Sequence, residues 1–216
     1  RADDRLVTAT NPDDSGARTL AATSPSLGAS VALARGVRAY ANVATAFETP
    51  TTTELANRPT AAGGFNPDLQ PQRARSAEVG VNGARTLGRR AAATWQVALF
   101  RARLDDALVP FEVPNAPGRQ FFRNAGRAAH DGVEAGATLA VGTAWSLRAA
   151  YTGLRARFVD YRVGDSSYAG RGVPGVAARR AEWAIGWRGP REALVELEQR
   201  AQGPTWADDR NSARSP

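Results

Sequence analysis

The feature that most constrains this chain is an alternation of apolar and polar side chains with a period of two residues. From Ala181 to Trp187 the odd positions carry Ala, Trp, Ile and Trp, whereas Arg180 and Glu182 occupy the other face. A period of two is that of a β-strand, because successive side chains point to opposite faces of a sheet. A helix over the Ala-rich residues 135–150 is the alternative there, but the clean alternation and the internal glycines favour strands. The pattern predicts an all-β chain with strands at 26–34, 37–46, 76–84, 91–104, 131–141, 145–158, 179–187 and 193–200, and a candidate ninth strand at 2–9.

The connections between these strands alternate between short and long. In an up-and-down antiparallel sheet, successive connections fall at opposite ends, so all short turns lie at one end and all long loops at the other. This asymmetry is typical of outer-membrane β-barrels, which have short periplasmic turns and long extracellular loops. The short turns are expected near 35–36, 86–89, 142–144 and 189–190, and the long loops at about 10–23, 47–74, 105–124, 159–177 and 202–216.

The apolar face of such a sheet needs a second layer to cover it. The sequence shows no amphipathic helix for this purpose, and a bilayer can serve instead, since a spanning strand needs only about 9–11 residues. Aromatic side chains lie near the ends of several apolar faces, as in the girdles at the membrane interface; ordinary core packing is the alternative for any one of them. These aromatic residues are Trp95, Trp145, Tyr151 and Trp187.

Arginines continue two of the apolar faces towards the long loops. Arg101 and Arg103 follow Leu99, and Arg155 and Arg157 follow Tyr151 in the same way. An arginine facing lipid costs about 2–4 kcal/mol at the midplane of the bilayer and about 0–1 kcal/mol near its boundary. We therefore expect these arginines to lie above the outer hydrocarbon boundary, among lipid and the phosphates of lipopolysaccharide.

Composition excludes several classes of function. The chain of 216 residues has no Cys and one His, His130, which removes disulfide scaffolds, thiol catalysis and multi-His metal sites. No catalytic constellation, cofactor motif or metal site is expected, so the chain is predicted not to be an enzyme. The net charge is +7, but Arg alternates with Asp and Glu along the chain, which does not favour nucleic-acid binding.

Two motifs at the loop ends of strands carry a family resemblance, supported by later matches. The stretch from Tyr40 to Leu55 and the stretch from Asn66 to Gly80 together resemble the TonB-dependent receptors of the Gram-negative outer membrane. Gln72 departs from the pattern, which more often has Glu there. Glu78 alternates with Val79 and is expected to face the lumen, paired with an arginine or solvated. The motif residues are Tyr40, Asn42, Phe47, Pro50, Glu54, Leu55, Asn66, Pro67, Leu69, Pro71, Glu78, Gly80, Asn124, Gly126, Gly132 and Glu134.

The resemblance implies a membrane-spanning, antiparallel, up-and-down barrel of 22 strands, of which this chain supplies about eight or nine. Residues 1–216 then belong to the C-terminal part of the barrel domain, without the plug domain and the final strands. The family imports scarce ligands, most often ferric siderophores, and its plug domain contacts the TonB complex. Residues in the long loops would bind an anionic, aromatic-rich ligand through Arg hydrogen bonds and ring stacking; packing among the loops is the alternative. The candidates are Arg119, Phe121, Phe122, Arg123, Tyr161, Tyr168, Arg171 and Trp206.

Two other classes of protein stay open at this point. A passive porin-like or secretion channel would share the barrel pattern but would lack a plug and a TonB-contact segment. A soluble β-rich binding module would bury its apolar faces against protein instead of lipid.

Overall fold

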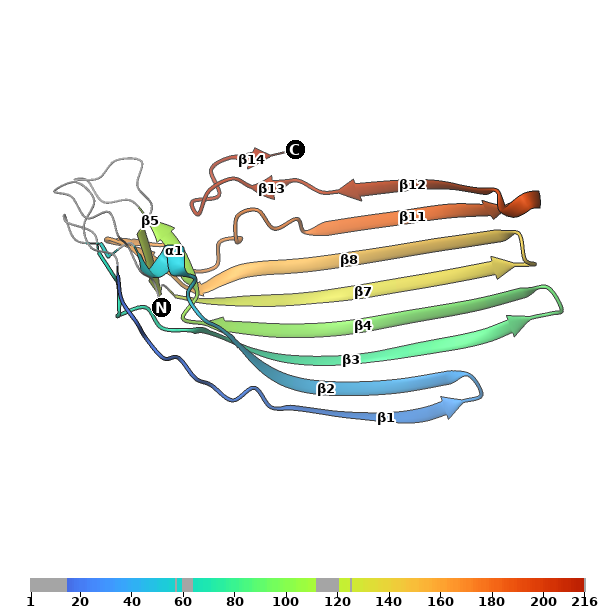
Figure 1. Ribbon diagram of the computed structural model, residues 1–216, viewed down its shortest axis with the longest axis horizontal. Helices are drawn as coiled ribbons and strands as arrows, with labels where there is room; N and C mark the ends of the chain where they lie inside the picture. The colour runs from blue at the N-terminus through green and yellow to red at the C-terminus, as the bar shows by residue number, and fades with distance from the viewer. Residues whose placement is uncertain (1–14, 57, 60–63, 112–120, 125, 216) are drawn as a thin grey trace.

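One antiparallel sheet of eight strands dominates the chain, in a computed structural model that describes residues 15–56, 58–59, 64–111, 121–124 and 126–215. Each strand of this sheet pairs with the next one along the chain, so the topology is up-and-down, as predicted (Figure 1). The candidate strand at 2–9 lies outside the described residues. The strands are β1 (Ser26–Ala34), β2 (Val37–Glu48), β3 (Gln72–Leu87), β4 (Ala91–Asp105), β7 (Arg127–Val141), β8 (Trp145–Asp160), β11 (Arg179–Arg188) and β12 (Leu194–Gln202).

The two ends of the sheet differ as the connection lengths predicted. At one end tight turns join the strands, and Gly36, Gly88 and Gly142 supply positive φ angles there. At the other end the long connections form a layer of loops (Figure 1). The turn between β11 and β12 holds a 3-10 helix, η1 (Pro190–Glu192). The loop layer holds α1 (Thr52–Leu55) and three small hairpins, β5 (Leu108–Phe111) with β6 (Phe121–Asn124), β9 (Arg162–Val163) with β10 (Ser166–Ser167), and β13 (Thr205–Trp206) with β14 (Arg214–Ser215).

Several strands run further towards the loops than the predicted ranges. β3 has 16 residues and begins at Gln72, whereas the apolar pattern marked only 76–84. β7 likewise begins at Arg127, four residues before the predicted 131. The reason is that the backbone ladder continues after the apolar side chains stop, with arginine and aspartate on the outward face. Hydrophobicity therefore marked the part of each strand whose outward side chains are apolar, and not its full length.

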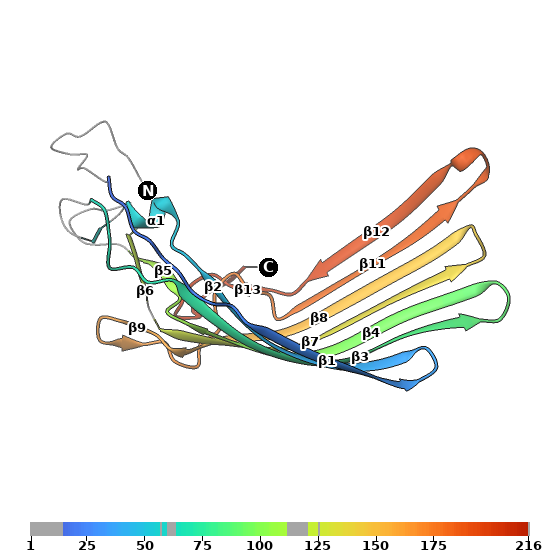
Figure 2. The same ribbon diagram turned by 60° about the horizontal axis from the view of Figure 1, so that its bottom comes forward.

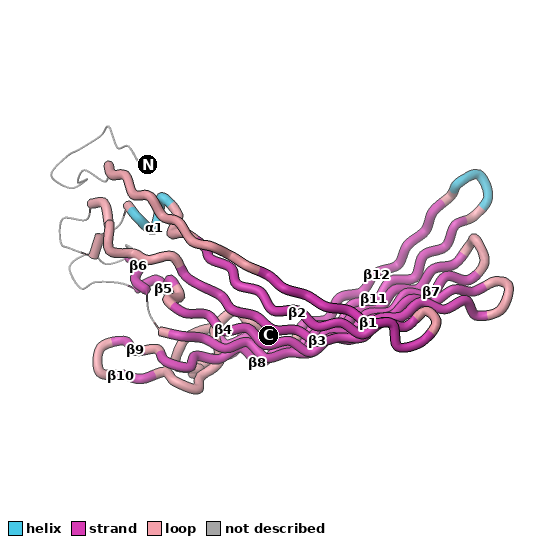
Figure 3. The backbone as a smooth tube through the Cα atoms, turned by 90° about the horizontal axis from the view of Figure 1, so that it is seen from below, coloured by secondary structure: helices cyan, strands magenta, loops and turns pink. Residues whose placement is uncertain are grey.

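The sheet forms one curved layer (Figures 2 and 3). Its inner face carries mainly polar and small side chains and its outer face mainly apolar ones. The inner face encloses a hollow of about 830 Å³ near the turns, lined by Thr94, Gln96 and Arg148 among others. The outer face leaves large aliphatic side chains uncovered: Leu27 is 74% exposed, Leu99 58% and Leu197 61%. An exposed apolar surface of this extent marks contact with a membrane or a partner. Within the described ranges, no helix has the length and hydropathy required to span a bilayer.

The main cluster of buried side chains lies in the loop layer, at the end of the sheet. Phe158, Tyr161 and Tyr168 form this cluster, with Val109 and Val173 packed against them. Within the described ranges the sheet is open, because β1 and β12 each have a strand on one side only. The described residues therefore form a curved sheet that carries a layer of loops at one end.

Candidate functional site

The loop layer is built on a stack of three aromatic rings. The ring centroids of Phe158 and Tyr161 lie 4.6 Å apart, and those of Tyr161 and Tyr168 lie 5.5 Å apart. The Tyr161 hydroxyl donates a hydrogen bond of 3.0 Å to the carboxylate of Asp209. Burial raises the pKa of Tyr161, and the neighbouring Asp209 carboxylate raises it further. This stack therefore joins the connection after β8 to the connection after β12.

Arg123 fixes the β5–β6 hairpin to the same stack. Its guanidinium lies 4.8 Å from the centre of the Phe111 ring and donates a hydrogen bond of 3.2 Å to the Arg162 carbonyl. It also interacts with the Tyr161 hydroxyl. Phe121 is 1% exposed, and its ring centroid lies 6.2 Å from that of Phe111. Among the described residues, the Arg123 Nε atom is buried without a hydrogen-bond acceptor.

The third part of the loop layer joins β13 and β14 to the connection before β11. Arg171 donates to the carbonyl of Arg210 and lies 5.9 Å from the Tyr168 ring. The Arg214 guanidinium stacks at 4.1 Å over Trp206. Asn211, which has a positive φ of 55°, accepts a hydrogen bond from the Gly172 amide at 2.7 Å and donates to the Gly172 carbonyl at 2.9 Å.

The structure thus brings most of the predicted ligand-binding residues into one layer. Phe121, Tyr161 and Tyr168 are buried, and they support the loops in this arrangement. Phe122, Arg123 and Trp206 are half-buried and Arg171 is exposed, so these four have surface to offer a ligand. Arg119 lies outside the described residues. The assignment of these side chains to ligand binding stays a prediction.

Asn124 holds two long loops together. Its side-chain nitrogen donates to the carbonyls of Gln70 and Asp106, both at 2.8 Å, and its side-chain oxygen accepts from the Gln70 amide at 2.6 Å. The amide of Asn can donate and accept at the same time, which explains why this motif position suits Asn. The loop after β2 is therefore tied directly to the loop after β4.

Asn124→Ala should release these two loops from one another. Loss of the three hydrogen bonds is expected to cost about 1–2 kcal/mol, since each contributes about 0.5–1.5 kcal/mol and the site is partly solvated. Hydrogen exchange of the Gln70 amide measures the effect, with expected acceleration of roughly tenfold. Asn82→Ala is the matched control, because Asn82 lines the inner hollow near the turns, at the opposite end of the sheet from these loops. Equal exchange of Gln70 in both variants would show that Asn124 does not join the loops.

The motif residue Glu54 and the nearby Thr51, in the connection after β2, have a local structural role that the sequence reasoning missed. Thr51 and Glu54 form a capping box at the start of α1: the Thr51 amide donates to Glu54 at 2.6 Å, and the Glu54 amide donates to the Thr51 hydroxyl at 3.3 Å. The signal was present, because Thr followed three residues later by Glu is the sequence pattern of this cap. The loop carboxylate at position 54 therefore stabilises a helix start.

The second motif forms a compact turn that returns the chain to β3. Asn66 is 3% exposed, and its side chain accepts from the Asp68 amide at 3.2 Å. The Asn66 amide donates to the Leu55 carbonyl at 2.6 Å, and Arg18 donates to the carbonyls of Pro67 and Leu69. Pro50 and Pro71 are buried where the ladders of β2 and β3 stop.

Asp208 fixes the last loop by accepting several hydrogen bonds. The Ser212 hydroxyl donates to it at 2.7 Å, and the amides of Ser212 and Ala213 donate at 3.2 Å. The hydroxyl of Ser212 is the main cause that lowers the pKa of Asp208. Within the described part of the chain, no group of three His, Asp or Glu side chains could hold a metal ion.

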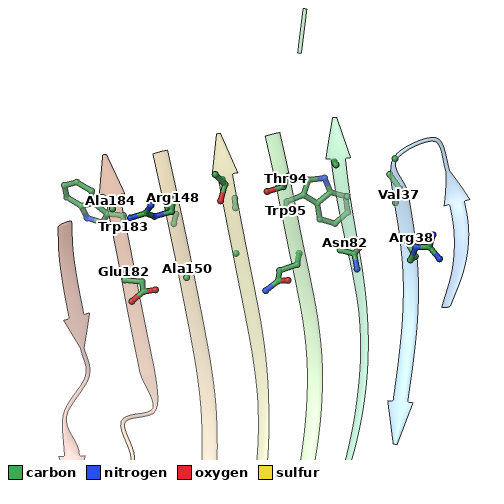
Figure 4. Close-up of a pocket in the computed structure, with 18 of the residues that line it drawn as sticks. Val37, Arg38, Asn82, Thr94, Trp95, Arg148, Ala150, Glu182, Trp183 and Ala184 are labelled. Atoms are coloured by element: carbon green, nitrogen blue, oxygen red, sulfur yellow. The ribbon is translucent and has the colours of Figure 1, made fainter. Parts of the chain in front are cut away.

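The inner face of the sheet changes in character from one edge to the other. Towards β11 and β12 it carries ion pairs: Arg148 lies 2.8 Å from Glu196, and Arg200 lies 2.5 Å from Glu198 and 3.8 Å from Glu182. In Figure 4 the Arg148 side chain extends from its strand towards the neighbouring one. On β3 and β4 the hollow is lined by neutral polar and small side chains, among them Asn82, Ala84, Thr94 and Gln96, and Arg38 of β2 lines it beyond them.

Glu78 and Glu134 both lie on the inner face, as predicted for Glu78. Glu78 lies next to the Tyr40 hydroxyl, which interacts with it. Gly80 makes this possible, since a Cβ there would lie 2.6 Å from the Tyr40 ring. The motif residues Tyr40, Gly80 and Glu78 thus form one packed unit on the inner wall.

The outer face carries a belt without charge on most strands. On β4 the outward positions from Ala91 to Leu99 are uncharged, and on β8 the same holds from Trp145 to Gly153. The eight steps from the first to the last of these positions extend about 27 Å along a strand. At a tilt of about 40° this is about 20 Å across a bilayer, close to the apolar band of about 25 Å seen in such barrels. Arg85 on β3, near the turn end, and Arg179 on β11, paired with Gly153, are exceptions.

The aromatic residues of this belt do not all lie at its boundary. Trp145 and Trp187 pair across β8 and β11 at the turn end, as expected for a girdle. Tyr151, paired with Ala135 and Ala181, lies one outward position before the last uncharged one, Gly153, and so lies near the end of the apolar face of β8, as expected. Its hydroxyl extends past Gly153, where a Cβ would lie 3.2 Å away. The ring therefore leans towards the loop end of the belt. Trp95, paired with Gly83 and Ala137, lies instead in the middle of the belt on β4.

Comparison with known proteins gives a consistent result. The sequence matches the family described as "TonB dependent receptor-like, beta-barrel" over residues 1–216. The siderophore receptor PiuA from Acinetobacter baumannii is similar in structure, with a TM-score of 0.63, 18% identity, and coverage of 88% of this chain and 27% of that one. The ferric yersiniabactin uptake receptor FyuA from Yersinia pestis gives a TM-score of 0.62, 23% identity, and coverage of 88% and 27%. The ferric-catecholate import receptor Fiu from E. coli K12 gives a TM-score of 0.60 and 20% identity, with coverage of 85% of this chain and 25% of that one. The chain thus spans about a quarter of the length of these structures.

Proposed function

Because this chain belongs to the TonB-dependent receptor-like β-barrel family, we propose that it is part of the barrel of an outer-membrane receptor that imports a ferric siderophore. The family consists of receptors for ligand import and not of enzymes, which confirms the prediction that the chain is not an enzyme. The observation that supports the proposal best is the two-sided sheet, with an exposed apolar outer face and a polar, hollow inner face. A soluble β-rich module would cover that outer face with its own residues.

Residues 1–216 are proposed to be a segment of a larger barrel, of about 22 strands. Among the residues that the structure describes, β1 and β12 each lack a neighbouring strand on one side, which supports this, because unpaired backbone groups in a bilayer cost several kcal/mol each. Strands from the rest of the parent protein would pair with both edges and close the wall. The inner face would then enclose a plug domain, through which the TonB complex supplies the energy for import.

The loop layer is proposed to bind the ligand on the outer side of the membrane. The half-buried or exposed side chains of Phe122, Arg123, Arg171 and Trp206 place cations beside aromatic rings, which suits an anionic, aromatic-rich iron chelate. PiuA, FyuA and Fiu, which have the same fold, are described as receptors for siderophores, ferric yersiniabactin and ferric catecholates. Arg119 completes the proposed set.

Two measurements in the parent organism test this function. A strain that lacks the receptor is grown on a panel of iron chelates and, separately, on cobalamin. It should fail to grow when one of the iron chelates is the iron source. A strain that lacks TonB should show the same defect. Uptake that persists without TonB would favour the passive channel. A normal growth profile on every iron chelate would contradict siderophore import.

In the full-length receptor, Arg119→Ala together with Arg123→Ala should weaken binding of that chelate about tenfold or more, equivalent to about 1.4 kcal/mol. The physical reason is the loss of two charge-assisted hydrogen-bond donors. Equilibrium binding to whole cells measures the change. Arg89→Ala with Arg90→Ala, in the turn after β3, removes the same charge from the opposite end and should leave affinity unchanged. Unchanged affinity in the first variant would remove Arg119 and Arg123 from the site.

A further inference from the structure

The outer face of the sheet becomes strongly cationic at one depth, where the uncharged belt ends. The strand register places Arg101, Asp131 and Arg155 in one row across β4, β7 and β8. The next row towards the loops holds Arg75, Arg103, Ala129 and Arg157 across β3, β4, β7 and β8. We call these two rows the arginine band. Cross-strand partners share a face, so all these side chains project outwards.

The charge of the arginine band is only partly balanced within the protein. Asp131 accepts from the Arg101 Nε atom and lies 3.8 Å from the Arg157 guanidinium. Arg75, Arg103 and Arg155 are exposed, and no carboxylate of the described residues lies within salt-bridge distance of them. Asp131 therefore pairs with two arginines of the band, and the other three have no carboxylate partner among the described residues.

On β4, β7 and β8 the excess of positive charge on the outer face is confined to this depth, whereas Arg85 on β3 and Arg179 on β11 are outward arginines at other depths. In the row nearer the loops, Arg73, Asp105, Arg127 and Asp160 alternate in sign, and Arg127 pairs with Asp160 at 3.3 Å. In the row on the other side, Val79, Leu99 and Val133 are all aliphatic. The arginine band thus borders directly on the apolar belt and covers about 14 Å by 7 Å, from the usual strand and pleat spacings.

The occupant of this surface must be anionic at one end and apolar directly below it. A lipid of the outer leaflet meets both conditions, because its acyl chains cover the belt and its headgroup lies at the boundary. Guanidinium groups bind phosphate oxygens in a forked geometry that an ammonium group lacks. An acidic soluble protein would gain nothing from the aliphatic row beside the arginines.

We propose that the arginine band binds the phosphate groups of an anionic, phosphorylated lipid of the outer leaflet. The proposal depends on the membrane placement of the sheet in the proposed function, and not on siderophore binding or on TonB. Asp131 positions Arg101 and Arg157 and at the same time limits the charge of the site.

The test uses the purified full-length receptor in a neutral detergent, with native mass spectrometry to count bound lipid. The probe is the diphosphorylated lipid A of lipopolysaccharide, and its enzymatically dephosphorylated form serves as the paired ligand. The native receptor should retain the phosphorylated lipid at least tenfold more strongly than the dephosphorylated one. Millimolar inorganic phosphate should not displace the lipid, and displacement by phosphate alone would overturn its assignment as a lipid site.

Arg75→Gln, Arg103→Gln and Arg155→Gln combined should reduce lipid retention at least tenfold. The matched control combines Arg85→Gln, Arg89→Gln and Arg90→Gln, which removes the same charge at the turn end and should retain the lipid. Should the first combination fail to fold, Arg103→Gln alone is expected to reduce retention about threefold. Retention equal to that of the native protein, or an equal loss in the control, would overturn the proposal. Since no siderophore or TonB enters this measurement, failed import would leave its result intact.

Discussion

Val97→Arg should destabilise the barrel in lipid by about 2–4 kcal/mol, whereas Gln96→Arg on the adjacent residue should cost less than about 1 kcal/mol. Val97 pairs with Val81 and Ala135 in the middle of the uncharged belt, so an arginine there would enter hydrocarbon. Gln96 lines the inner hollow, where water can solvate a charge. The two variants add the same side chain one residue apart, on opposite faces of one strand.

Equilibrium unfolding of the full-length receptor in phospholipid vesicles measures both free energies. Assembly in cells gives a second measure, since only Val97→Arg should reduce the folded, heat-modifiable form in the outer membrane. Equal stability of the two variants would contradict the assignment of the odd positions of β4 to lipid.

Gly126→Ala should destabilise the loop layer by roughly 3 kcal/mol or more. Gly126 has a φ of +75°, and a Cβ there would lie 1.8 Å from the carbonyl oxygen of Asp160. The substitution therefore adds both backbone strain and a clash with the end of β8, just before the buried Tyr161. The Cβ atom of Ala is fixed to the backbone and cannot rotate away from the Asp160 carbonyl. The start of β7 and the end of β8 must therefore move apart.

Gly142→Ala is the control for backbone strain alone. Gly142 has a φ of +59° in the turn between β7 and β8, and nothing lies within 4 Å of an added Cβ. Its expected cost is about 1–2 kcal/mol. Thermal unfolding followed by Tyr and Trp fluorescence measures both variants, and a cost for Gly126→Ala no larger than that of Gly142→Ala would refute the close approach to Asp160.

The sheet could be predicted from the sequence because lipid on one side and water on the other impose the alternation directly. The pattern located the strands of the sheet and their faces, with Glu78 inward and Val79 outward. It did not locate the loop ends of strands such as β3 and β7. There charged side chains replace apolar ones on the outward face, as at Arg73, Arg75, Arg127 and Asp131, so the alternation of apolar and polar residues is lost although the backbone hydrogen bonds continue.

The loop layer was less predictable, because its contacts join residues far apart in the chain. The sequence marked Tyr161, Tyr168 and Phe121 as aromatic loop residues, but only the fold shows that Tyr161 and Tyr168 are buried against one another and that Phe121 is buried beside Phe111. Asn124 and Asn211 act through side-chain hydrogen bonds to backbone groups in other loops, which no local pattern reveals. The capping box at Thr51 and Glu54 is different, since its spacing was readable in the sequence.

The central claim is that lipid covers the odd-numbered face of the sheet and that the arginine band lies beyond its hydrocarbon. A spin-label scan of residues 95–103 in the full-length receptor in vesicles tests it most directly, by comparing collisions with oxygen and with a water-soluble nickel chelate. Labels at 95, 97 and 99 should favour oxygen and those at 96 and 98 should not, and labels at 101 and 103 should gain contact with the nickel chelate. Oxygen contact without a period of two, or a label at 101 that reports the middle of the bilayer, would contradict the account.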